Sequence, residues 1–270
     1  MNNKFVATNF PSISYVCKVS NLSDKEYATS ENANIEEPNI SESTEIQKPT
    51  KLINVPYINQ DDIVFGCEAV SATMLLQYYG YTISEKDFTD SYLIQKDWNT
   101  NEDGRAYGPD PNAAFPGNPY IDTGENCGYG CFAPALKKSI KKILNPELHE
   151  AKVTTGLSMN DLIMNYIDKD KPVLLWATMG MAKSSPGDSW IINFTDENSP
   201  YKIGDEFTWP RNEHCLVLVG YDTKHYIFND PYKNKGVIPY EKSLVNERFL
   251  ELGKQSVVIL NKEKREETLL

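Results

Sequence analysis

Residues 67–80 read CEAVSATMLLQYYG, and their pattern is that of an amphipathic helix. The apolar side chains recur at helical spacing, and Gly80 suits the position just beyond a helix C-terminus. Gly66 precedes the pattern, so the thiol of Cys67 is expected in the first turn of the helix. Free backbone amides and the positive end of the helix dipole favour a thiolate there. The stretch therefore predicts a helix that begins with a candidate nucleophile, although a buried structural cysteine fits the same position.

A second decisive stretch lies at residues 214–230. HCLVLVGYD (214–222) and HYIFND (225–230) read as two strands joined by a tight connection, which predicts a hairpin. His214 opens the first strand and Asp230 ends the second, so the turn brings the two side chains close together. A carboxylate in that position would hold the imidazole in one tautomer. The alternatives are a surface histidine and an Asp-Pro turn.

Four further residues bear on this pair. His149 falls in a polar loop and His225 in the hairpin turn, which leaves His214 as the best candidate base. Asn229 could orient the imidazole ring, but strand alternation puts it on the face opposite Asp230. Gln60, seven residues before Cys67, could join the Cys67 backbone N–H in an oxyanion hole.

The rest of the chain predicts helices followed by strands. Helices are expected at 84–87, with Ser84 as the cap, and at 132–144 and 159–170. Residues 52–60 alternate as in a strand, and further strands are expected at 172–179 and 256–260. Residues 98–131 are rich in glycine and proline and are expected to form a long loop. Helices first and antiparallel strands later are typical of an α+β fold.

Three blocks resemble one known family. Gln60, six residues, then GCEA (66–69) with Tyr78-Tyr79-Gly80 resemble the start of the C39-like cysteine peptidases, a branch of the papain-like superfamily. EHCLVLVGYD (213–222) followed by Asn-Asp-Pro (229–231) resembles the His and Asp segments of that family, and GYGCFAP (128–134) resembles its bacterial members. The resemblance covers about 51–260. It implies a papain-like α+β fold, in which an N-terminal helical part carries the cysteine and an antiparallel sheet carries the histidine and aspartate.

The resemblance also implies a chemistry. Cys67 would be the nucleophile, His214 the general base and acid, Asp230 the orienting residue and Gln60 the oxyanion donor. Such a site hydrolyses peptide or amide bonds through an acyl-enzyme, with no metal or cofactor. The chain has no transporter and no P-loop motif, so it is similar to the stand-alone branch, with a peptide or protein as substrate.

Two other functions remain open from the sequence. The same site could pass its acyl group to an amine, as an acyltransferase or transpeptidase. Alternatively, the scaffold could be a non-catalytic surface-binding module, with the loop tyrosines Tyr107, Tyr120 and Tyr129 as a recognition surface. Ordinary packing of a long loop would explain the same tyrosines.

Composition and charge indicate how the chain is divided and which partners are excluded. Residues 1–50 are poor in apolar side chains and are expected to form a disordered or weakly ordered acidic arm, before a peptidase domain at 51–262 and a polar tail at 263–270. The net charge of -11 and pI of about 4.9 argue against nucleic acid. No apolar run is long enough to cross a bilayer, and the first 20 residues do not read as a signal peptide. An extracellular or envelope location is expected from the acidic arm and the resemblance, with the cytoplasm as the alternative. The oligomeric state is left open.

The five cysteines do not form a disulfide framework, because their number is odd in a chain of this size. Cys127 and Cys131 lack a second pair of ligands nearby, which argues against zinc. A local disulfide between these two cysteines and a pair of free thiols are both compatible with the sequence.

Overall fold

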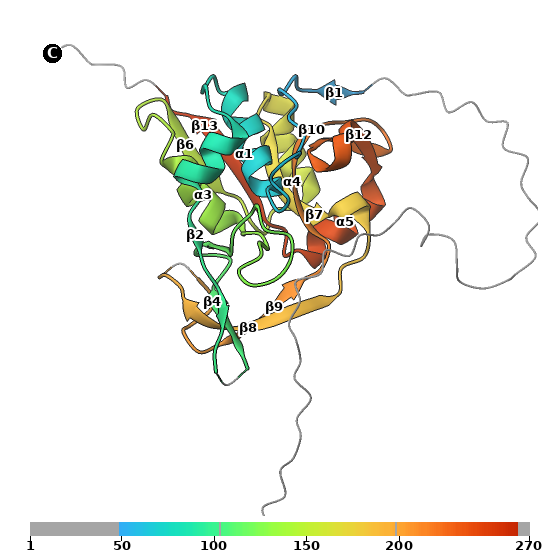
Figure 1. Cartoon of the computed structure of the whole chain (residues 1–270). Coiled ribbons are helices and arrows are strands. Elements are labelled where there is room, and N and C mark those ends of the chain that lie inside the picture. Colours follow the sequence, from blue (N-terminus) through green and yellow to red (C-terminus); the bar gives the residue numbers. More distant parts are fainter. Residues whose placement is uncertain (1–48, 103, 198, 264–270) are drawn as a thin grey trace, which may run out of the picture.

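An antiparallel sheet with helices packed on it forms the body of the molecule (Figure 1). The computed structural model describes residues 49–102, 104–197 and 199–263. All but the last two residues of the expected arm at 1–50 lie outside this range, as does the expected tail beyond Glu263. Among the described helices, none is both long and apolar enough to cross a membrane.

The main sheet has seven strands in the order β12-β11-β10-β7-β13-β6, with β1 paired to β10. Every pairing in it is antiparallel. β10 lies between β7 and β11, so the strand that carries His214 is held from both sides. The strands are β1 Lys51–Leu52, β6 His149–Val153, β7 Val173–Thr178, β10 Glu213–Tyr221, β11 His225–Asp230, β12 Gly236–Glu241 and β13 Ser256–Asn261.

Helices cover the sheet. The helix that begins at Cys67, α1, packs against β10 and β7, and α3 packs against β6 and β13. α5 contacts β7, β11 and β12. The helices are α1 Cys67–Tyr78, α2 Glu85–Asp87, α3 Ala133–Lys141, α4 Met159–Asn165 and α5 Lys242–Glu251, with single turns at Phe88–Tyr92, Ile167–Lys169, Met179–Met181 and Tyr232–Asn234.

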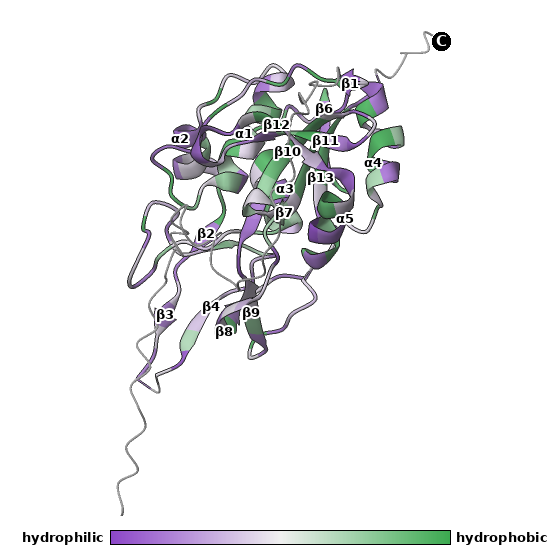
Figure 2. Ribbon diagram, turned by 90° about the vertical axis from the view of Figure 1, so that its right-hand side faces the viewer, coloured by the Kyte–Doolittle hydropathy of each residue, from purple (hydrophilic) through white to green (hydrophobic). Residues whose placement is uncertain are grey.

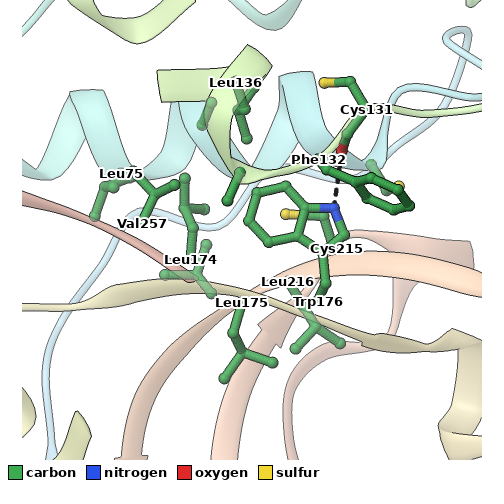
Figure 3. Packing of buried hydrophobic residues seen from close by; sticks show 14 of the residues in the cluster. Leu75, Cys131, Phe132, Leu136, Leu174, Leu175, Trp176, Cys215, Leu216 and Val257 are labelled. Carbon is green, nitrogen blue, oxygen red and sulfur yellow. Dashed lines mark hydrogen bonds between the residues drawn. The ribbon is translucent and has the colours of Figure 1, made fainter. Parts of the chain in front are cut away.

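The core lies between α1, α3 and the central strands, where the apolar strands gather in the middle of the molecule (Figure 2). All six residues of β7 are buried, as expected of a strand covered on both faces. Trp176 fills the centre of the layer and donates its indole N–H to the Cys131 carbonyl at 2.9 Å (Figure 3). This bond ties the loop before α3 to the sheet.

A second, smaller sheet extends away from the body (Figure 1). It has the order β3-β4-β8-β9, and β8 and β9 come from the 180–212 segment. Its aromatic side chains pack inward, and Trp209 stacks on Phe132 with ring centroids 5.6 Å apart. The strands are β3 Asn99–Thr100, β4 Ala106–Pro109, β8 Pro186–Phe194 and β9 Glu206–Pro210, and β2 Gln95–Lys96 pairs separately with β5 Phe115–Pro116.

The elements with strong patterns agree with the sequence predictions. The helix at 67–80, the hairpin and the strands at 172–179 and 256–260 are all present, and Ser84 accepts the Asp87 N–H at 3.0 Å. The expected strand at 52–60 is wrong beyond its first residues, because after the hydrogen bond from the Ile53 N–H to the Val219 carbonyl the chain leaves β10. The 159–170 helix ends at Asn165 and continues only as a short turn. The loop at 98–131 contains short strands. β6 begins at His149, where the sequence suggested a polar loop, and β8, β9, β12 and α5 were not predicted either.

Candidate active site

Cys67 is the first residue of α1, as the sequence predicts, and Gly66 is required before it. A Cβ added at Gly66 would lie 2.4 Å from the Ile63 side chain, so the chain turns into the helix only with glycine there. The Cys67 side chain is 7% exposed. The turn therefore fixes the thiol at the edge of the core, beside the free amides of the helix start.

The protonation state of Cys67 differs from the sequence expectation. Burial raises the pKa of the thiol well above its usual value, and the neighbouring Glu68 and Glu213 carboxyls raise it further. The Sγ atom donates to Glu68 Oε2 at 3.2 Å. In this arrangement Cys67 is a neutral thiol, because a helix N-terminus does not offset burial beside two acids.

Two buried carboxyl groups adjoin this thiol. Glu68 is fully buried, and burial raises its pKa to about 7. Its Oε1 accepts the Cys131 N–H at 2.5 Å. Burial also raises the pKa of Glu213 well above its usual value, with the Glu68 charge as the second cause. The Oε1 atom of Glu213 has no hydrogen-bond partner among the described residues.

The sequence analysis assigned no role to Glu68 or Glu213. Each is a single acid beside an apolar run, Glu68 at the start of α1 and Glu213 at the start of β10. A charged residue at a predicted core position was the available signal, since Glu is almost never fully buried without a partner.

His214 and Asp230 form the best-ordered part of the site. The His214 Nε2 atom lies 2.8 Å from Asp230 Oδ1, and the two residues are 1% and 0% exposed. Burial acts to raise the Asp230 pKa, but the His214 charge and the hydrogen bonds to the carboxylate outweigh it and lower the pKa. Asp230 is therefore a stable carboxylate that fixes the histidine ring.

Two further groups hold Asp230. The Tyr232 backbone N–H donates to Oδ1 at 3.0 Å, and the Tyr240 hydroxyl donates to Oδ2 at 2.7 Å. Tyr240 belongs to β12, a strand the sequence analysis did not predict. Asn229 points to the other face and donates to the Val55 carbonyl at 3.1 Å, as strand alternation predicts.

The packing of α1 on β10 brings the thiol and the imidazole into one region. Ser71 Oγ donates to the Cys215 carbonyl at 3.0 Å, one residue after His214. The Cys215 backbone also lies beside the Cys67 thiol, and the His214 charge acts on the adjacent Glu68. Since Nε2 of His214 faces Asp230, Nδ1 is the nitrogen left for proton transfer.

Gln60 is near the site but is not a free donor. Its Nε2 donates to the carbonyls of Ile63 and Val64 at 3.0 and 2.7 Å. Its Oε1 is buried without a partner among the described residues. The Gln60 backbone N–H donates to the Pro231 carbonyl at 2.8 Å, which anchors this loop beside Asp230. The side chain thus shapes the turn before α1.

The other histidines have local partners. The His149 ring lies 2.6 Å from the Tyr81 hydroxyl, and His225 lies 2.9 Å from Asp222. Neither belongs to the Cys67 region, which agrees with the choice of His214.

The cysteines resolve one alternative that the sequence left open, and two of the loop tyrosines have local partners. Cys131 is a free thiol and Cys127 is disulfide-bonded, so the local Cys127–Cys131 disulfide is wrong. Tyr129 is half-buried, and its ring lies 5.7 Å from that of Trp209. Tyr120 is 36% exposed and donates to Asp90 at 2.6 Å. Packing accounts for Tyr129, and Tyr120 has a local partner.

A helix that starts with cysteine, packed on an antiparallel sheet that carries a buried His–Asp pair, defines the α+β papain-like class of folds. The comparison with protein families agrees: the sequence profile of the Peptidase_C39 like family matches residues 52–257. The chain belongs to this family.

Two relatives show how far the similarity extends. "Uncharacterized protein YvpB" of Bacillus subtilis (strain 168) is 25% identical over 229 residues, which are 80% of this chain and 78% of that protein. A Bacillus anthracis protein whose crystal structure carries the name "putative C39-like peptidase" is 26% identical, with a TM-score of 0.64. That alignment covers 79% of this chain and 99% of the other.

Proposed function

We propose that this protein is a cysteine peptidase that cleaves peptide or amide bonds through an acyl-enzyme on Cys67. The observation that carries the proposal is the buried His214–Asp230 pair, 2.8 Å apart, on the strand that packs against the helix beginning at Cys67. A carboxylate-oriented imidazole beside a helix-start thiol is the arrangement that activates a cysteine nucleophile. Membership of the Peptidase_C39 like family supports the same chemistry.

The proposed reaction begins with a change at the thiol. Cys67 leaves its hydrogen bond with Glu68 and transfers its proton to Nδ1 of His214, while Asp230 stabilises the imidazolium. The thiolate attacks the substrate carbonyl, and His214 returns the proton to the leaving amine. Water then attacks the thioester, loses its proton to His214, and releases the acid with the free thiol.

The developing oxyanion needs donors. The Cys67 backbone N–H, in the first turn of α1, is the first candidate. Gln60 becomes a second donor only if substrate binding displaces one of its two backbone carbonyl partners.

The substrate is proposed to lie outside the cytoplasm, in the medium or the cell envelope. The disulfide at Cys127 supports this location, since such bonds persist in oxidising compartments.

The test is cleavage of a mixed peptide library by the full-length chain, followed by mass spectrometry. Products from the native chain that are absent with Cys67→Ala and with His214→Ala support the proposal. Cys215→Ser is the matched control, because Cys215 is a buried free thiol without an assigned role. An added amine reports acyl transfer if the products carry it. Equal cleavage by Cys67→Ala, or iodoacetamide reactivity of Cys67 that is unchanged in His214→Ala, would remove the proposal.

A further inference from the structure

We propose that Cys67, Glu68 and Glu213 form a binding site for a thiophilic divalent cation of the zinc class. One ligand atom from each residue, the Cys67 sulfur and one carboxylate oxygen from each acid, lies within 4.8 Å of the other two. All three residues are buried. The site joins the start of α1 to the start of β10.

The spacing suits a cation after a small closing movement. Zinc takes thiolate sulfur at about 2.3 Å and carboxylate oxygen at about 2.0–2.2 Å. Two such ligands on one tetrahedral ion lie about 3.5 Å apart. Rotation of the three side chains would close the ligand atoms, now within 4.8 Å of one another, onto the ion.

Glu213 supplies the independent sign of a missing ligand. It is only 7% exposed, and no described group donates a hydrogen bond to its Oε1. Lysine and arginine ion pairs among the described residues involve neither Glu213 nor Glu68. A buried Glu213 oxygen left this way beside a second acid carries a cost, which a bound cation offsets.

The carboxyl groups of Glu68 and Glu213 converge beside Gly130. A Cβ added at Gly130 would lie 2.4 Å from Glu68 Oε1 and 2.9 Å from Glu213 Oε2. The same point is 2.9 Å from the Trp209 ring, so β9 of the small sheet closes this side. Glycine at position 130 therefore leaves room in which the carboxylates meet.

The donor set selects the class of ion. A thiolate with two carboxylates suits zinc better than calcium or magnesium, which prefer oxygen ligands alone. Three protein ligands leave a fourth position for water. A cation held there would occupy the sulfur that the proposed peptidase reaction needs, so the inhibitory consequence, unlike the binding itself, rests on the proposed function.

The experiment is calorimetric titration of zinc into the full-length chain after treatment with a chelator. Cadmium replaces zinc in a parallel titration, in which ultraviolet absorption reports thiolate ligation. One zinc per chain is expected, with affinity reduced by about 10- to 100-fold or more in Glu213→Gln, since loss of even an outer partner costs that much. Exposed Glu206→Gln is the matched acid control, and Cys215→Ser is the matched thiol control; both should bind as the native chain does.

Three results would overturn the site. The first is that the folded chain binds no stoichiometric zinc, and the second is that Glu213→Gln binds zinc as tightly as the native chain. The third is that His214→Ala abolishes zinc binding while Glu213→Gln retains it. The last result would place the ion between Cys67 and His214. If circular dichroism shows that Glu213→Gln is unfolded, Glu68→Gln takes its place. Peptide cleavage measured with chelator present and no zinc tests the proposed function separately.

Discussion

The two halves of the candidate site differ in how well their polar groups are satisfied. Asp230 receives hydrogen bonds from His214, Tyr232 and Tyr240, and its pKa is lowered although it is fully buried. Glu213, also buried, has an oxygen without a partner among the described residues, and its pKa is raised. Burial thus leaves one acid a carboxylate and disfavours charge on the other, because the His214 charge and the hydrogen bonds outweigh burial at Asp230 alone.

This difference means that the His214 ring is already oriented, whereas the Cys67 thiol is not yet activated. The His214–Asp230 half is organised before substrate arrives, since it lies on two paired strands of the main sheet. The Cys67 half holds a neutral thiol against Glu68 and must change before it can react. Substitutions in the His214–Asp230 half are therefore expected to remove hydrogen bonds that the protein already makes. A substitution among the acids of the Cys67 half is expected to remove a buried oxygen that lacks a partner.

Asp230→Ala should give the largest effect. It leaves the His214, Tyr232 and Tyr240 donors without their acceptor, and breaking such a buried pair costs about 3–5 kcal/mol of unfolding free energy. Cleavage should fall by about 10⁴-fold, since the imidazole loses its fixed tautomer. Urea unfolding and peptide cleavage measure the two effects.

The matched control for this change lies on the same hairpin. Asp222 bonds to His225 at 2.9 Å, but the His225 side chain is 32% exposed. Asp222→Ala should leave the specific activity of the folded protein unchanged. Equal loss of activity in both variants would show that Asp230 acts only through hairpin stability.

Glu213→Gln should act in the opposite direction on stability. The amide is neutral without binding a proton, whereas the buried Glu213 carboxyl must stay protonated above its unfolded pKa, and the amide can donate an N–H to Glu68, so unfolding in the presence of chelator should become harder by about 1–3 kcal/mol. Glu206→Gln, on an exposed position of β9, should stay within about 0.5 kcal/mol of the native value. A clearly destabilised Glu213→Gln protein would mean that the native carboxyl is already well partnered.

Tyr240→Phe should weaken the ordered half without dismantling it. The change removes the 2.7 Å hydrogen bond to Asp230 Oδ2, for an expected loss of about 1.5–3 kcal/mol in unfolding free energy. A decrease in kcat of about tenfold, or about 1.4 kcal/mol, would accompany it. Tyr221→Phe removes a similar bond to Asp168 at the surface and should change neither quantity measurably. If the two variants behave alike, Tyr240 has no part in orienting His214.

The sequence predicted the ordered half better than the other. His214 and Asp230 stand at the ends of two strands with strong patterns, so the predicted hairpin brought them near one another, whereas Cys67 was joined to them through the resemblance to the C39-like family. Tyr240 could not be found, because Gly236 and Pro239 weaken the strand pattern of β12 and its partner is known only from the strand order. The contact between Glu68 and Glu213 could not be predicted from the sequence either, because it depends on how α1 packs across β10.

Gln60 and the 180–212 segment show a second limit to what could be predicted from the sequence. The position of Gln60 before Cys67 suggested an oxyanion donor, but its amide hydrogens satisfy two carbonyls of the local turn. Short-range hydrogen bonds of this kind leave no periodic signal. β8 and β9 are held by aromatic packing and by pairing of β8 with the distant β4, which only the assembled chain determines.

Acid should weaken the ordered half as pH falls through the folded pKa of Asp230. The folded pKa of Asp230 lies below the unfolded value of about 3.9, so the carboxylate contributes stability above about pH 4 that is lost as pH falls through the folded pKa. Unfolding free energy of the native chain should decline over this window, and the decline should be smaller in Asp230→Asn, which carries no proton to gain. Urea titrations at a series of pH values between about 3 and 6 measure the slopes, with Asp161→Asn as the control for an exposed acid whose lowered pKa comes from its Ser158 cap. Identical slopes in the native and Asp230→Asn proteins would place the acid sensitivity elsewhere and remove the distinction drawn between the satisfied and the unsatisfied acids.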